Sequence, residues 1–323
     1  MVKKILSVDG GGMYGVVPLE VCIAIEEAMG KQLKDIFDLF VGTSTGSLIV
    51  ASAVGGLGGD QPFGLPATTI MEQYKELGLK IFSAKKNNIK IPGVDITKYP
   101  KYDSFALRSS LNKVVGEKRL GTYNRDISIS AYDMTRAKPH FFRSWISSEP
   151  KINKDVLLRD AVMASSSAPT FHPLVKVSDF YYTDGGVFAG NPASFAMGQA
   201  LERYPGEDLI VVSLGTGLRD LQPNPQDPDE DVFWWAKSIA SVLLDGQNEA
   251  ADDVMKQIAS KSGWLDYYRF EVNLPSGEND PQKRADETDF DGVLKKARDF
   301  MKKKITTTDK SKFDAMIQEL KKS

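Results

Sequence analysis

The chain alternates short apolar runs with longer segments of helical periodicity over its first two thirds. Strands are predicted at the apolar or alternating runs 4–8, 36–42, 126–134, 140–145 and 208–217, and at "FYYTDGG", which runs into a turn. Helices are predicted at 18–29, 47–56, 155–168 and 191–204, with Gly30 and Pro169 as stop signals. Because strands and helices are interleaved, we predict an α/β fold with a central, mainly parallel sheet flanked by helices.

Two segments between the predicted elements have the composition of loops. Residues 55–67 are rich in glycine and proline, and residues 221–231 are acidic and rich in proline. The second loop precedes a section, about 230–323, that we predict to be helical. Its last part places Phe290, Leu294, Ala297 and Met301 at helical spacing, opposite lysine and arginine. We predict a single domain over 1–323, with a motif-bearing core over 3–217.

An aromatic run, Phe233, Trp234 and Trp235, begins the C-terminal section. Tryptophan suits the headgroup depth of a bilayer because its ring is apolar and its N–H is polar. Packing in the core or under a lid explains the same residues, and we favour packing over membrane contact.

Composition narrows the classes of function. A chain of 323 residues with 41% hydrophobic residues can bury a substantial core, and its net charge of -2 gives no support to general nucleic-acid binding. Cys22 is the only cysteine, which excludes an intrachain disulfide and fits a reducing compartment. "MVKK" leads directly into a strand-like run, and no stretch of about 18 uncharged apolar residues is present. We therefore predict a cytoplasmic protein, with peripheral contact at a membrane left open.

The sequence "GTSTG", Gly42 to Gly46, lies between a predicted apolar strand and a predicted apolar helix. In this setting G-x-S-x-G is the pattern of a nucleophile elbow, a sharp turn that presents a serine hydroxyl above the sheet edge. Gly42 and Gly46 leave room for the turn and for the helix that follows. An ordinary glycine-rich turn is the alternative, but the flanking strand and helix favour the elbow, with Ser44 as the nucleophile.

A serine hydroxyl needs a base to accept its proton. The two histidines are poorly placed for this role, because His140 falls within a predicted strand and His172 lies between two prolines. Asp184 follows a predicted strand and precedes two glycines, so a tight turn would present its carboxylate at the sheet edge; a simple Asp-Gly turn is the alternative. Since the ordinary pKa of aspartate is about 3.9, the site would have to desolvate it and stabilise the oxyanion strongly.

The stretch "SVDGGGMYG" has Gly10, Gly12 and Gly15 in the G-x-G-x-x-G pattern of a dinucleotide-binding turn. Bare backbone N–H groups at the start of a helix hold a phosphate or a tetrahedral oxyanion equally well. Asp9, directly before the loop, disfavours an anionic pyrophosphate, and no acidic residue ends a second strand about 20 residues on. These features favour oxyanion stabilisation, and a nucleotide-binding α/β protein that uses the "GGGMYG" loop is the more distant alternative.

Five segments occur in the order and spacing of the patatin-like phospholipases: "ILSVDGGGMYGVVPLEVC", "FDLFVGTSTGSL", "SSSAPTFHP", "YYTDGGVFAGNP" and "VVSLGTG". The chain resembles this family over residues 3–217. The resemblance implies a three-layer patatin-like fold and a Ser-Asp dyad, with Ser44 as nucleophile and Asp184 as base. It further implies an oxyanion hole made by the amides of Gly10, Gly11 and Gly12. The implied substrates are acyl esters of phospholipids, lysophospholipids or galactolipids, cleaved without a cofactor or metal.

The chain departs from the family pattern at two places. Many relatives carry arginine or lysine at the position of Tyr14, and many read Asn-Asn-Pro where this chain has Gly190, Asn191 and Pro192. Some compact bacterial members that the chain resembles are switched on by a cyclic nucleotide to degrade the cell's own membrane. A regulated effector with a small-nucleotide activator is therefore an alternative. A binding module without activity is disfavoured because the dyad and the glycine loop are complete, and a homo-oligomer is left open.

Overall fold

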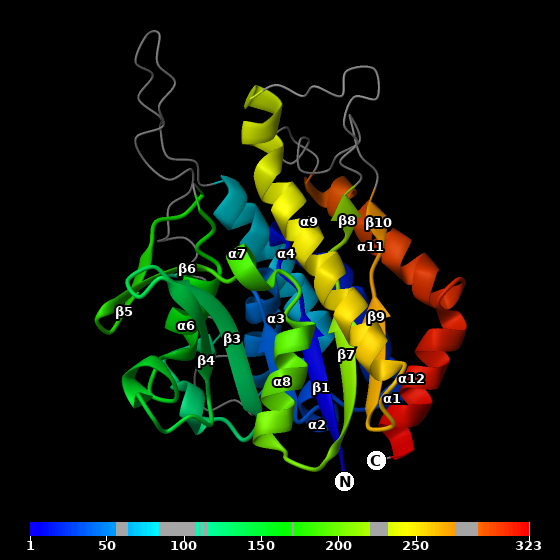
Figure 1. The fold of residues 1–323 in the computed structure, drawn as a ribbon. Coiled ribbons are helices and arrows are strands. Elements are labelled where there is room, and N and C mark those ends of the chain that lie inside the picture. The colour runs from blue at the N-terminus through cyan, green and yellow to red at the C-terminus, as the bar shows by residue number, and fades with distance from the viewer. Residues whose placement is uncertain are drawn as a thin grey trace.

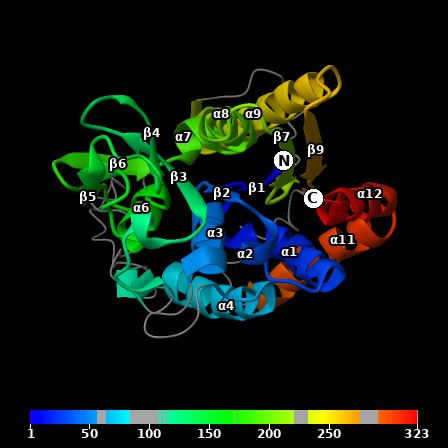
Figure 2. The ribbon, with the colours of Figure 1, turned by 90° about the horizontal axis from the view of Figure 1, so that it is seen from below.

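A mixed sheet forms the middle layer of the fold, and helices cover both of its faces (Figure 1). The computed structural model describes residues 1–55, 64–83, 108–109, 111–112, 115–169, 171–219, 232–274 and 290–322, without the side chains of 77–83, 219, 232–241, 290, 291 and 293. Figure 2 shows the helices α1 (Val16–Met29), α3 (Thr45–Gly55) and α4 (Ala67–Ser83) on one face, and α8 (Ala193–Arg203) and α9 (Val232–Ala259) on the other. The predicted α/β fold with a sheet flanked by helices is confirmed.

Five parallel strands form the centre of the sheet. In sheet order they are β3 (Asp126–Asp133), β2 (Leu39–Gly42), β1 (Val2–Val8), β7 (Asp208–Leu214) and β9 (Leu265–Phe270). Three antiparallel strands complete it, namely β4 (Lys138–Arg143) and β6 (Phe180–Asp184), which both pair with β3, and β5 (Val175–Val177), which pairs with β6. The sheet is therefore mainly parallel, with its antiparallel strands gathered at one side.

β3 is long enough to pair with two strands along one edge. Its first half pairs in parallel with β2, where Gly42 lies opposite Ile129. Its second half pairs antiparallel with β6, where Asp184 lies opposite Ala131, while β4 occupies the other edge. β2 and β6 therefore approach each other end to end, and their last residues lie two positions apart along β3.

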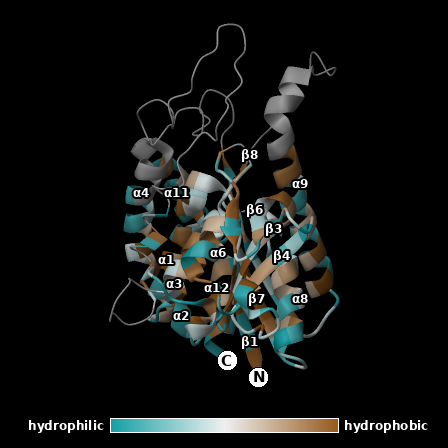
Figure 3. Cartoon of the chain, turned by 90° about the vertical axis from the view of Figure 1, so that its left-hand side faces the viewer, coloured by the Kyte–Doolittle hydropathy of each residue, from teal (hydrophilic) through white to brown (hydrophobic). Residues whose placement is uncertain are grey.

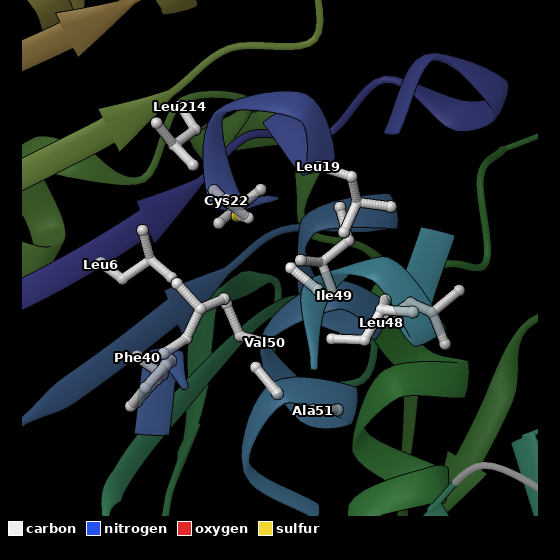
Figure 4. Close-up of a cluster of buried hydrophobic side chains, with 14 of the residues drawn as sticks. Leu6, Leu19, Cys22, Phe40, Leu48, Ile49, Val50, Ala51 and Leu214 are labelled. Carbon is white, nitrogen blue, oxygen red and sulfur yellow. The ribbon is translucent and has the colours of Figure 1, made fainter. Parts of the chain in front are cut away.

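The main hydrophobic core lies between the sheet and the helices α1 and α3. Figure 4 shows Leu6, Phe40 and Leu214 from the strands facing the helices, with Cys22 of α1 and Ile49 of α3 against them; all five are fully buried. Every residue of α3 is buried, which explains its apolar character on all sides. Figure 3 shows hydrophobic residues along the sheet, and hydrophilic and hydrophobic residues together on the helices that cover it.

The C-terminal section is only partly helical, which corrects the prediction for about 230–323. β9 joins the main sheet beside β7, and β10 (Asn273–Leu274) pairs with β8 (Leu218–Arg219). The strand was missed because β9 is an edge strand that carries charged residues, whose partners come from distant parts of the chain. α11 (Phe290–Thr306) and α12 (Lys310–Lys322) are helical, and the predicted stripe of α11 is buried at Leu294, Ala297 and Met301.

Some predicted features lie outside the described residues. These are most of the 55–67 loop, the 221–231 loop, and the side chains of Phe233, Trp234, Trp235 and Phe290. Within the described part of the chain, no helix combines the length and the apolar character needed to cross a bilayer.

Two predicted elements have different ends in the structure. The apolar run 36–42 is split, since Ile36 ends α2 (Leu33–Ile36) and only Leu39–Gly42 forms β2. Asp38 interrupts the run because its carboxylate accepts the backbone N–H of Lys4 at 3.0 Å, beside the sheet. The run 155–168 is helical only over α6 (Leu158–Ser165).

Candidate active site

Ser44 lies in the sharp turn between β2 and α3, with φ at +50°. This left-handed conformation costs about 1–3 kcal/mol for a residue other than glycine, so the surrounding structure must hold it. The Ser44 N–H donates to Oγ of Ser165 at 2.8 Å. The Ser44 carbonyl accepts from the amides of Ser47 and Leu48 at 2.9 and 3.3 Å. The backbone of the predicted nucleophile is therefore held on both sides.

The two glycines of the elbow are required by close approach of backbone. A Cβ at Gly46 would lie 2.1 Å from the carbonyl oxygen of Val8, and a Cβ at Gly42 would lie 2.6 Å from the backbone of Gly46. These distances are far below van der Waals contact and involve main-chain atoms, which cannot rotate away. Glycine at both positions allows α3 to begin directly against the end of β1.

Gly46→Ala is expected to destabilise the protein by several kcal/mol, because the added methyl group would push β1 away from the elbow. The matched control is Gly198→Ala, at an exposed position inside α8 where an added Cβ meets nothing within 4 Å. That variant should gain about 0.5–1 kcal/mol of helix stability. Chemical denaturation measures both, and equal stabilities for the two variants would contradict this account of the elbow.

Asp184 ends β6 and is almost fully buried, with 5% of its surface exposed. Its N–H donates to the carbonyl of Ser167 at 3.0 Å, and its Oδ1 accepts the amide of Gly186 at 2.7 Å. Burial raises the pKa of Asp184 from 3.8 to about 6, and hydrogen bonds from the Gly186 amide and the Ser44 side chain oppose this rise. The two predicted dyad residues are thus brought into contact, 140 positions apart in the sequence.

Ser44 and Asp184 are neighbours because β2 and β6 pair end to end along the same edge of β3. Since the two strands run toward each other, the residues just after β2 and at the end of β6 lie at one point of the sheet edge. Thr43 ties the elbow to that point, because its Oγ1 lies 2.7 Å from Oγ of Ser130 in β3 and donates to the carbonyl of Ala189 at 2.7 Å. Sequence reasoning had not singled out Thr43 or Ser130.

The glycine loop between β1 and α1 lies directly against the elbow. A Cβ at Gly10 would be 3.3 Å from the Cβ of Ser44. The Gly10 N–H donates to the carbonyl of Gly190 at 2.9 Å, so this amide, predicted as an oxyanion donor, already has an acceptor. Among the described residues, the amides of Gly11 and Gly12 have none. The predicted set of three donors is therefore reduced to the two amides of Gly11 and Gly12.

Side chains from three directions hold the carbonyl groups of this loop. Thr216 donates to the Gly10 carbonyl at 2.7 Å, and Thr45 donates to the Gly12 carbonyl at 2.5 Å. The hydroxyl of Tyr74 in α4 donates to the same carbonyl of Gly12. These three donors fix the orientation of the loop, and with it the direction of the Gly11 and Gly12 amides.

Asp9 does not discriminate between anions in the way its position in the sequence indicated. Its carboxylate is fully buried and accepts two hydrogen bonds from the guanidinium of Arg269 in β9, at 2.9 and 2.6 Å. Arg269 also contacts Glu271 at 2.8 Å. The charge of Asp9 is thus neutralised within the core, and the sequence could not show it because the partner lies 260 positions away.

His140 has a structural environment. It lies in β4, on the edge of β3 opposite Asp184, and its Nε2 is 3.0 Å from the carbonyl oxygen of Ile152. Its ring packs against Phe142 and Tyr182, and burial lowers its pKa to about 4. His172 is half-buried beyond α6, and burial lowers its pKa as well. In the described part of the chain, no group of three or more histidine, cysteine, aspartate or glutamate side chains is arranged to hold a metal ion.

The two positions at which the chain departs from the family pattern, Tyr14 and Gly190, both lie in packed parts of the structure. Tyr14 is 1% exposed and belongs to the hydrophobic core. A Cβ at Gly190 would lie 2.4 Å from Oδ1 of Asn248 in α9, so an asparagine at this position would require the Asn248 side chain to shift. Asn191 accepts the amide of Ala193 at 3.0 Å and donates to the carbonyl of Asn248 at 3.2 Å, which attaches α8 to α9.

Comparison with known families agrees with this arrangement. The family model described as patatin-like phospholipase matches residues 6–197, more than half of the chain. This chain belongs to the patatin-like phospholipase family. Members of this family are lipid acyl hydrolases of the serine hydrolase class, and the chain is an enzyme of that class.

Individual relatives extend the similarity beyond the matched segment. Patatin-like protein 2 of Arabidopsis thaliana is 28% identical over 292 residues, covering 78% of this chain and 70% of that protein. Patatin group J-1 of Solanum tuberosum is 24% identical over 354 residues, covering 98% of this chain and 88% of that protein. VipD from Legionella pneumophila superposes with a TM-score of 0.40 at 15% identity, over 93% of this chain and 66% of that one. The alignment with the potato protein therefore includes the C-terminal section as well as residues 3–217.

Proposed function

We propose that this chain hydrolyses carboxylic esters of membrane phospholipids or lysophospholipids through a dyad of Ser44 and Asp184. The observation that carries the proposal is the contact of these two side chains. Ser44 is held in a strained turn, and its side chain lies beside the buried carboxylate of Asp184. Burial raises the pKa of this carboxylate to about 6, and the Ser44 side chain opposes that rise. Such a carboxylate is ionised at pH 7, yet it is a stronger base than an exposed aspartate.

In the first half of the proposed reaction, Oγ of Ser44 attacks the ester carbonyl carbon while Asp184 accepts the hydroxyl proton. The amides of Gly11 and Gly12 stabilise the oxyanion of the tetrahedral intermediate. The intermediate collapses, the carbon–oxygen bond to the alcohol breaks, and the proton on Asp184 passes to the departing alcohol or lysolipid. An acyl ester on Ser44 remains, and Asp184 is ionised again.

In the second half, Asp184 accepts a proton from water, and the hydroxide attacks the acyl ester on Ser44. The second oxyanion uses the same two amides, and Ser44 leaves with the proton from Asp184. A fatty acid is released and the enzyme returns to its starting state. One buried carboxylate thus serves as base and acid in both halves, which accounts for a site without a catalytic histidine.

The more distant alternative, nucleotide binding by the glycine loop, receives less support. The loop lies against Ser44, and one of its amides is already bound to Gly190. The space in front of the remaining amides is therefore shared with a serine hydroxyl, which suits a reacting carbonyl oxygen better than a pyrophosphate. Activation by a cyclic nucleotide, cytoplasmic location, homo-oligomer formation and contact with a membrane surface stay predictions.

Product analysis with a phospholipid that carries two different acyl chains tests the proposal. The wild-type chain should release one or both fatty acids, detected by mass spectrometry, and Ser44→Ala should release none. The matched control is Ser52→Ala in α3, whose buried hydroxyl donates only to the carbonyl of Leu48, at 2.8 Å. A fluorophosphonate probe should label wild type and Ser52→Ala but not Ser44→Ala. A folded Ser44→Ala protein with full activity would disprove the proposed role of Ser44.

A further inference from the structure

One short segment at the end of α6 contacts both members of the proposed dyad. Ser165 is fully buried, and its Oγ accepts the N–H of Ser44 at 2.8 Å. Two residues later, the carbonyl of Ser167 accepts the N–H of Asp184 at 3.0 Å and the hydroxyl of Thr183 at 2.7 Å. The segment therefore sets the distance between two main-chain positions that come from different strands.

The N–H of Ser44 has no acceptor within its own turn. The first amides of α3 bond to carbonyl groups of the turn itself, Gly46 to Thr43 and Ser47 to Ser44. The Ser44 amide precedes the helix and points toward α6, where the hydroxyl of Ser165 receives it. Without that hydroxyl, a largely buried N–H would lose its partner, and the left-handed φ of Ser44 would lose one of the contacts that hold it.

We propose that Ser165 is a positioning residue for the hydrolysis, because it holds the main chain of Ser44 from the same segment that holds Asp184. This inference rests on the proposed function, in which Ser44 attacks the ester. Ser165 does not touch the reacting atoms in this proposal. It keeps Oγ of Ser44 in line with Asp184 and with the Gly11 and Gly12 amides, and displacements of about 1 Å at such a centre reduce rates about 100-fold.

The kinetic test compares Ser165→Ala with Ser52→Ala. Both remove a buried hydroxyl from a helix, but the hydroxyl of Ser52 in α3 donates to the carbonyl of Leu48 at 2.8 Å, within its own helix. Ser165→Ala should lower kcat about 10- to 100-fold with KM nearly unchanged, because binding of the lipid does not depend on the turn. Ser52→Ala should keep kcat close to wild type. Equal losses in the two variants, or an unchanged kcat in Ser165→Ala, would overturn the inference.

A second measurement does not depend on activity. Hydrogen exchange of the Ser44 amide, followed by NMR on protein labelled with ¹⁵N-serine, should be slow in wild type and Ser52→Ala and at least about tenfold faster in Ser165→Ala. Unchanged exchange in Ser165→Ala would show that the hydroxyl does not hold this amide. If Ser44→Ala retained activity, the proposed function would be wrong. The exchange rates would still show whether the Ser165 hydroxyl holds the Ser44 amide.

Ser165→Thr separates positioning from overall stability. Threonine keeps the hydroxyl acceptor but adds a methyl group at a position with no exposed surface, so its melting temperature should fall. Its kcat and the protection of the Ser44 amide should nevertheless recover toward wild type. A Ser165→Thr protein that folds but shows the low kcat and the fast exchange of Ser165→Ala would contradict the proposal.

Discussion

Replacing Asp184 by asparagine is expected to abolish ester hydrolysis and, above pH 6, to make the protein more stable. Asparagine has nearly the same shape and can still accept the amide of Gly186, but it cannot accept the proton of Ser44. The rate should fall on the order of 10³–10⁴-fold. In the wild-type protein, kcat/KM should fall about tenfold per pH unit below an apparent pKa of about 6, since only the ionised carboxylate acts as base.

The gain in stability follows from the direction of the pKa change. The pKa of Asp184 is about 6 in the native state and 3.8 ordinarily, so the native state binds the proton more tightly than the unfolded chain does. The stability due to this proton is fully present below pH 3.8 and is lost as the pH rises through 6, a loss of about 3 kcal/mol. Asparagine has no charge to bury and avoids this loss. Asp184→Asn should therefore melt about 5 °C higher than wild type at pH 8 and at nearly the same temperature at pH 4.

Asp133→Asn is the matched control for this prediction. Asp133 is also fully buried and lies in the neighbouring strand β3, but its carboxylate is paired with Arg136 at 2.6 Å and accepts two backbone amides. Removing its charge should lower the melting temperature at pH 8 and leave hydrolysis largely intact. Thermal melts and rates of both variants across pH measure the contrast. A lower melting temperature for Asp184→Asn at pH 8 would contradict the assigned desolvation of this carboxylate.

Replacing Arg269 by methionine is expected to destabilise the protein by about 3–5 kcal/mol. The guanidinium is buried between two carboxylates, Asp9 and Glu271, and it also donates to Oγ of Ser213 at 2.9 Å. Glu271 accepts the amides of Gly217 and Val272 at 2.7 and 2.8 Å and would keep these partners. Asp9 would be left fully buried without its cation, and the loss is the cost of either keeping its charge in the core or taking up a proton there.

A double variant tests this cause. Adding Asp9→Asn to Arg269→Met removes the uncompensated charge, so the double variant should be more stable than Arg269→Met alone. Asp9→Asn by itself should cost less than Arg269→Met, because Arg269 keeps Glu271. Urea denaturation gives the three free energies of unfolding. A double variant less stable than Arg269→Met would show that the loss comes from packing rather than from a buried charge.

The network around Arg269 also bears on the site. Asp9 immediately precedes the glycine loop, and Thr216, which follows β7, donates to the carbonyl of Gly10. β9 therefore supports the loop from the C-terminal section of the chain, through Asp9. This arrangement gives the C-terminal section, which lies beyond the family resemblance over residues 3–217, a part in positioning the proposed oxyanion donors.

The nucleophile elbow and the position of Asp184 could be predicted because the sequence patterns that indicate them span only a few neighbouring residues. A serine between glycines, after an apolar strand and before an apolar helix, is required by the sterics of one turn, as the contacts of Gly42 and Gly46 show. Asp184 was predictable for a similar reason, since a strand followed by two glycines presents its last side chain at a sheet edge. The roles of Ser44 and Asp184 in catalysis stay predictions until the variants are measured.

Ser165 was within reach of sequence reasoning but was not singled out. It stands in "SSSAPTFHP", one of the segments that carried the family resemblance. Three consecutive serines give no indication of which hydroxyl turns inward. That choice depends on where α6 ends relative to Ser44, and this is a property of the packed helix rather than of the segment.

By itself, the sequence determined most of the local conformations of this protein: the central strands other than β9, most of the helices, the glycine turns and the helix stop at Gly30. These depend on propensity, periodicity and sterics within about a dozen neighbouring residues. Only the tertiary structure decided that β2 and β6 meet end to end on β3, that the Gly10 amide is taken by Gly190, and that Arg269 neutralises Asp9. These contacts join residues up to 260 positions apart, and their free energy comes from burial and strand pairing that no local segment contains.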